Sequence, residues 1–183
     1  MPSNVVRCSL VSLSLLLTID AAAGEATAEV AVPSVVRQTA VGLDLGVASA
    51  LGFAGVTLTR QLASHWRIEA GAGLGMSGLQ LSLMPKLVLG QGRDHFVGGA
   101  GVSVALPGDS QYVSGHPIWL NVDAIGYEHQ FESGFALSST LGLTGGLGGG
   151  RICLPPDGCS PQFFEDVTHY WGPQGRVQLA YWF

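Results

Sequence analysis

The chain has 183 residues, of which 27 are glycine, about twice the usual share, and only 11% are charged. Its 8 lysines and arginines stand against 13 aspartates and glutamates, and its isoelectric point is near 5.4, so it lacks the basic surface that nucleic-acid binding requires. Hydrophobic residues make up 47% and the mean hydropathy is +0.36, which excludes disorder and indicates that water is not the only solvent.

The first residues have the layout of a secretory signal peptide. A cation at Arg7 precedes an apolar stretch over residues 10–19, and small residues follow at 21–23. The apolar stretch is well short of the ~20 residues that a membrane-spanning helix needs, so we expect the leader to be removed. Cleavage after Ala23 and cleavage after Ala28 fit equally well.

Two cysteines remain once the leader is gone. Cys8 lies inside the leader, whereas Cys153 and Cys159 enclose the turn sequence LPPDG in the exported chain. An even pair in an oxidising compartment predicts a disulfide that stiffens this segment.

Beyond the leader, apolar residues recur at every second position, which is the period of a two-sided strand. In 79–89, five leucines share one face and Gln80, Ser82 and Lys86 the other, an arrangement that no helix face produces. The predicted strands, in chain order, are 41–48, 54–59, 66–75, 79–89, 96–105, 118–127, 135–144 and 173–183.

Two of these strands carry a predicted irregularity. Pro85 cannot donate a ladder hydrogen bond, so we expect a bulge or kink in the fourth strand. In the sixth strand, Ile125 and Tyr127 have the opposite parity to Ile118 and Val122, which predicts a bulge in its second half.

The pattern as a whole predicts an all-β fold in a membrane. After residue 30 no stretch is apolar for the length of a transmembrane helix, and a closed sheet is the other membrane architecture that satisfies every backbone polar group. The predicted turns alternate between short ones and long connections at 106–117 and 145–172, an asymmetry typical of outer-membrane barrels. We therefore expect an eight-stranded antiparallel up-and-down transmembrane β-barrel with its leucines toward lipid. The expected organisation is a signal peptide over 1–23 (alternative end at 28), an N-terminal periplasmic segment over 24–39 and the barrel over 40–183.

The last strand carries a recognisable pattern. Val177, Leu179, Tyr181 and Phe183 occupy alternate positions, and the sequence ends on the aromatic residue. This resembles the carboxyl-terminal signal that the barrel-assembly machinery reads in bacterial outer-membrane proteins. With the leader and the eight strands, the chain resembles the small OmpA-like and OmpX-like barrels. The resemblance implies an integral protein of the outer membrane of a Gram-negative cell, in contact with lipid and lipopolysaccharide.

Six charged residues fall on the predicted inner face, three acids and three bases. An eight-stranded barrel is just wide enough for side chains to fill, so these charges should pair and plug the interior. Asp44 and Arg176 lie on the first and last strands and would be neighbours where the barrel closes. The alternative is an ion pathway or narrow pore. The six residues are Asp44, Arg67, Glu69, Lys86, Asp123 and Arg176.

The histidines are candidates for a metal site, and the aromatic residues are candidates for contacts at the membrane interface. His65, His95 and His129 fall near the short turns, while His116 and His169 fall in the long connections, so we expect no shared metal site. An interfacial aromatic girdle is predicted at the periplasmic ends of the strands. Its members are Trp66, Phe96, Tyr127, Phe131, Phe135, Tyr181 and Phe183.

Fold and resemblance do not select a function, because such barrels serve as anchors, adhesins, pores and lipid-modifying enzymes. A lipid-A-modifying enzyme would need a Ser and His near the outer rim, where Ser110, Ser114 and His116, with His169 and Asp166 across the rim, are the nearest candidates without a defining motif. We expect a monomer without cofactor or active site, with a structural or surface-interaction role through its outer loops. The alternatives are a narrow channel and a lipid-A-modifying enzyme.

Overall fold

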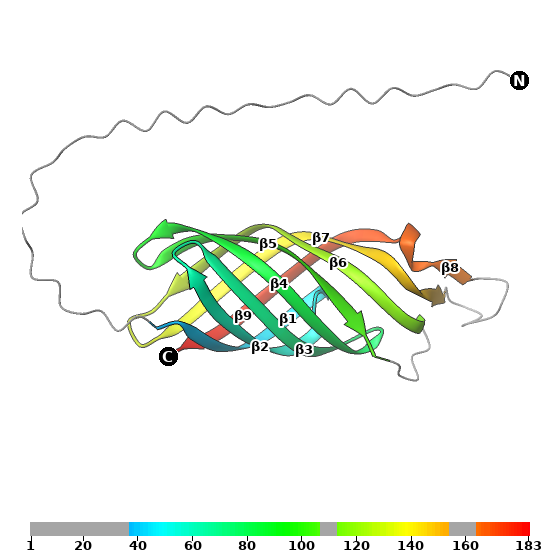
Figure 1. The fold of residues 1–183 in the computed structure, drawn as a ribbon, viewed down its shortest axis with the longest axis horizontal. Coiled ribbons are helices and arrows are strands. Elements are labelled where there is room, and N and C mark those ends of the chain that lie inside the picture. The colour runs from blue at the N-terminus through cyan, green and yellow to red at the C-terminus, as the bar shows by residue number, and fades with distance from the viewer. Residues whose placement is uncertain (1–36, 107–112, 154–163) are drawn as a thin grey trace, which may run out of the picture. The chain divides into compact units, whose positions relative to one another are not determined.

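The computed structural model describes residues 37–106, 113–153 and 164–183, which form an all-β, closed, antiparallel barrel (Figure 1). A three-residue strand, β8, and a 3₁₀ turn, η1 (Val167–His169), lie in the connection before the last long strand. The strands are β1 (Thr39–Ser49), β2 (Gly52–Ala63), β3 (Trp66–Gly75), β4 (Gly78–Gln91), β5 (Asp94–Ala105), β6 (Val113–Gln130), β7 (Phe135–Cys153), β8 (Phe164–Asp166) and β9 (Trp171–Trp182). Among these residues no helix is long and apolar enough to cross a membrane.

The barrel closes between its first and last long strands. Each long strand pairs with its chain neighbour, β7 pairs with β9, and β9 pairs with β1 from Ala40↔Trp182 to Val47↔Gly175. Every long strand therefore has two hydrogen-bonded neighbours over the body of the barrel, which leaves no open edge there. The predicted eight-stranded antiparallel barrel is confirmed as a fold.

The two ends of the barrel differ. One end, called here the terminal end, carries Phe183 and the short β2–β3, β4–β5 and β6–β7 turns (Figure 1). The other end, called the loop end, carries the β1–β2, β3–β4, β5–β6 and β7–β9 connections. β6 and β7 are the longest strands, with 18 and 19 residues.

The polarity of the two faces is opposite to that of a water-soluble protein. Large apolar side chains point outward all around the barrel; examples are Leu43, Leu58, Leu74, Leu83, Val102, Leu141 and Leu179. Polar side chains point inward and are buried; examples are Thr57, Ser103, Asn121, Thr140 and Gln178. Because neighbouring residues of a strand face opposite sides, one alternating pattern produces both surfaces.

The bulge predicted in the sixth strand is confirmed. The register of β6 shifts by one residue between Asp123 and Ile125 against β7, and a matching shift appears against β5. Asp123 faces inward before the shift, whereas Gly126 and Glu128 face inward after it. The extra residue reverses the parity of every side chain that follows.

The sequence predicts a bulge or kink at Pro85, and no bulge is present. β4 keeps one register against β3 through Pro85↔Ile68, and its pairing with β5 omits residues 84 and 85 but resumes at Lys86↔Gly99 in the same register. The missing N–H of proline interrupts the ladder locally without adding a residue.

The two long connections are shorter than predicted. β6 already begins at Val113, and β7 continues through the glycine run to Cys153, where Gly145↔Leu120 and Arg151↔Ser114 are paired. A run of glycines has no side chains to alternate, so the period-two pattern disappears although the backbone still forms the ladder. Residues 107–112 and 154–163 of the predicted loops lie outside the described part of the chain.

Candidate functional site

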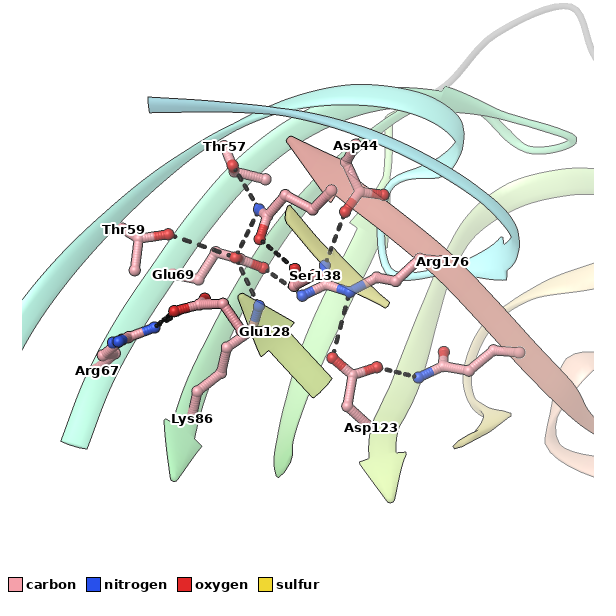
Figure 2. A network of polar contacts seen from close by, with 12 residues as sticks. Asp44, Thr57, Thr59, Arg67, Glu69, Lys86, Asp123, Glu128, Ser138 and Arg176 are labelled. Carbon is pink, nitrogen blue, oxygen red and sulfur yellow. Dashed lines mark hydrogen bonds and ion pairs between the residues drawn. The ribbon is translucent and has the colours of Figure 1, made fainter. Parts of the chain in front are cut away.

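The six charged residues predicted on the inner face are all buried in the barrel interior (Figure 2). Glu69 of β3 accepts hydrogen bonds from four donors. The Nζ of Lys86 lies 2.6 Å from its Oε2 and the Nη2 of Arg176 lies 2.8 Å from its Oε1. Gln178 Nε2 and Thr59 Oγ1 donate to Oε2 at 2.9 and 3.4 Å. Charge-assisted bonds of this kind are the strongest that a buried carboxylate forms.

Arg176 of β9 connects three carboxylates across the interior (Figure 2). Its Nη1 lies 3.2 Å from Asp44 Oδ2, its Nη2 lies 2.8 Å from Glu69 Oε1 and its Nε lies 3.2 Å from Asp123 Oδ2. Gln174, two residues earlier on the same face, donates to Asp123 Oδ1 at 2.9 Å. The contact with Glu69 is a hydrogen bond, and the contacts with Asp44 and Asp123 are ion pairs, so one guanidinium links side chains from β1, β3 and β6.

A seventh buried charge, Glu128, was missed by the sequence analysis. Arg67 Nη1 lies 2.9 Å from both carboxylate oxygens of Glu128, and its guanidinium carbon lies 4.5 Å from the centre of the Trp182 ring. Among the described residues the interior thus holds four acids and three bases, not the balanced set that was predicted. The sequence could have shown that Glu128 faces inward, because the bulge predicted in β6 reverses the parity of the residues beyond it.

Apolar side chains flank the charged residues. Ala40, Ala136, Ala180 and Trp182 form a buried cluster at the terminal end. The side chains of these ion pairs are 8% exposed or less, and each pair is electrostatically stronger in the interior than at a surface. Chemically, the arrangement suits holding eight strands in one geometry, since its charged groups are engaged with one another.

The predicted positions of the histidines hold at the short turns, but His116 lies within strand β6 and not in a long connection. His65 and His129 lie at the terminal end, where Ser64 Oγ is 2.9 Å from His65 Nδ1 and His129 Nδ1 is 2.7 Å from Asp94 Oδ1. Within the described residues, no group of three or more His, Cys, Asp or Glu is placed to hold a metal ion.

The candidates for an enzyme or a disulfide are described only in part. His116 in β6 and His169 in η1 are exposed at the loop end. Ser110 and Cys159 lie outside the described residues, as do the side chains of the other candidates there, which are Ser114, Cys153 and Asp166. The structure therefore places no catalytic constellation from these residues, and the disulfide stays a prediction.

The aromatic residues and the proposed assembly signal face outward. The side chains of all seven predicted girdle residues are exposed at the terminal end, and Phe135 packs on Tyr181 with ring centres 5.1 Å apart. Val177 and Leu179 lie on the same outer face of β9. Their recognition by an assembly machinery stays a prediction.

No protein-family model, curated protein or solved structure matches the chain at a significant level.

Proposed function

We propose that the protein is an integral outer-membrane β-barrel, a monomer exported by a signal peptide, with a structural or surface-interaction role through the connections at its loop end. The observation that carries this proposal is the inverted polarity of the barrel, with leucines and valines outward and charges inside. An apolar outer surface of this extent is unstable in water and matches the acyl chains of a bilayer.

The two ends of the barrel support one orientation in the membrane. Aromatic side chains gather on the outer surface at the terminal end, where they suit the boundary between acyl chains and head groups. The longest strands extend toward the loop end. In the proposed orientation the terminal end is periplasmic, and the β5–β6 and β7–β9 connections at the loop end meet the environment.

The filled interior favours an anchor over a channel. Arg176, Glu69 and Lys86 join opposite walls of the barrel at its middle, where a pore would need water. We expect no steady conductance from the purified protein in planar bilayers at moderate voltage. A steady conductance that disappears in Lys86→Gln or Asp123→Asn variants would favour the narrow channel instead.

The proposal is tested in cells. The full chain should fractionate with outer membranes and migrate faster on gels before heating than after it, as folded barrels do. An epitope inserted in residues 107–112 should bind antibody on intact cells, whereas the same epitope at Gly92, in the β4–β5 turn, should bind only after the envelope is opened. Soluble protein in the periplasm, or equal binding at both positions, would contradict the proposal.

A further inference from the structure

The β1–β2 turn folds inward at the loop end of the barrel. Ala50 and Leu51 are 2% and 0% exposed, although turn residues ordinarily lie in solvent. Ser49 Oγ donates to the carbonyl oxygen of Gly52 at 2.8 Å, and Ala48 has a φ of 52°, which non-glycine residues seldom adopt. These features bend the turn so that Leu51 enters the interior.

Three inward-facing glycines form the recess that receives this side chain. A Cβ added to Gly71 would lie 2.9 Å from both Leu51 methyl carbons, and one added to Gly55 would lie 2.9 Å from Leu51 Cβ and Cδ1. A Cβ on Gly73 would lie 2.8 Å from Leu51 Cβ. Any larger residue at these positions would overlap Leu51, so β2 and β3 leave a space that one leucine fills.

The recess begins beside the charged residues. Asp44 is the register partner of Gly55 across β1 and β2. Thr57, the next inward residue of β2, accepts a hydrogen bond at 2.8 Å from Gln178, which also donates to Glu69. Leu51 therefore lies between the loop end and the charged network.

A second connection enters the barrel from the opposite wall. Val167 of η1 is 0% exposed, and its Cβ lies 2.9 Å from the position of a Cβ on Gly146, an inward glycine of β7. β7 is far from β2 and β3 in the strand order. Apolar side chains thus reach into the loop end from both sides.

We propose that Leu51 is an apolar seal that separates the charged interior from solution at the loop end. An ion pair reached by water and salt is screened, whereas a sealed one keeps its strength. The seal is a property of the folded barrel and does not depend on the proposed membrane location, so it is testable in detergent micelles.

The test places a reporter thiol below the seal. In a Thr57→Cys variant, peptide mapping separates labelling at position 57 by methyl methanethiosulfonate, a small neutral reagent, from labelling of the chain's own cysteines. Adding Leu51→Ala should speed labelling at position 57 by at least about tenfold, because the lost side chain lowers the free energy of local opening. Leu74→Ala, the same change on the outer surface, should leave the rate unchanged. Equal rates with and without Leu51→Ala would overturn the proposal.

A second reporter and a compensating change keep the test decisive. Where Thr57→Cys prevents folding, Ser138→Cys on β7 serves as the reporter, since Ser138 is also buried beside Gln178. In the Leu51→Ala background, Gly71→Ala refills the recess and should slow labelling again by severalfold, although Gly71→Ala alone collides with Leu51. Labelling that stays fast in the double variant would show that the recess is not the seal.

Discussion

Replacing Glu69 by glutamine removes the carboxylate that joins two buried cations. Its side chain is 3% exposed and accepts bonds from Lys86 at 2.6 Å and from Arg176 at 2.8 Å. Two charged hydrogen bonds are worth about 3–6 kcal/mol together, and removing one partner of a buried ion pair typically costs about 3–5 kcal/mol. Glutamine keeps the volume but directs an amide donor at one of the two cations, so we expect Glu69→Gln to lower the unfolding free energy by about 3–5 kcal/mol.

The assay is reversible urea unfolding in lipid vesicles, followed by tryptophan fluorescence and gel mobility. Glu132→Gln is the matched control, because Glu132 pairs with Arg93 at the surface, where the two side chains are 80% and 56% exposed. A surface ion pair contributes about 0–1 kcal/mol to the unfolding free energy, so Glu132→Gln should leave the unfolding free energy nearly unchanged. Equal costs for the two variants would refute the argument that the interior network stabilises the barrel.

Two further pairs of substitutions test the facing and the packing of the strands. Leu83→Arg, on the outer surface of β4, should lower the unfolding free energy in vesicles by about 2–4 kcal/mol. Leu62→Arg also faces outward but lies near the terminal end, so it should lower the unfolding free energy by only about 0–1 kcal/mol. Similar unfolding free energies for the two variants would contradict the depth dependence. Gly142→Ala should lower the unfolding free energy by about 1–3 kcal/mol or prevent folding, because the added Cβ would overlap the carbonyl oxygen of Val122. Gly98→Ala should be tolerated, since its Cβ would meet an ordinary contact of 3.4 Å; gel mobility that is alike for the two alanine variants would contradict this reading.

The strands were predictable because their two faces differ in chemistry. β3 begins and ends at the predicted residues, Trp66 and Gly75, since its apolar and polar positions alternate without interruption. The continuation of β7 into 145–153 was not predictable, because glycines in that run carry no alternating side chains. At Pro85 the sequence shows that a donor is lost, but only the neighbouring strands decide whether the register shifts.

The inner face was predictable to the extent that parity could be followed. Asp44 and Arg176 were placed as neighbours from strand order, and the structure puts their side chains 3.2 Å apart. Glu128 was missed because its parity changes at the bulge after Asp123, and the bulge was not carried forward to the residues beyond it. The inward turn at Leu51 was also missed. The three glycines on β2 and β3 were interpreted as small residues that line the interior, and their sequence does not show that a side chain from the β1–β2 turn fills the space beside them.

The central claim is that the outer surface of this barrel faces acyl chains while its interior is closed. The most direct measurement is nuclear Overhauser transfer in lipid nanodiscs, from acyl-chain and water protons to leucine methyl groups. The methyl groups of Leu43, Leu83 and Leu179, which are exposed on the outer surface, should receive transfer from acyl chains, and those of Leu51 should receive none. Transfer from water to Leu43, Leu83 and Leu179, with none from lipid, would contradict the account.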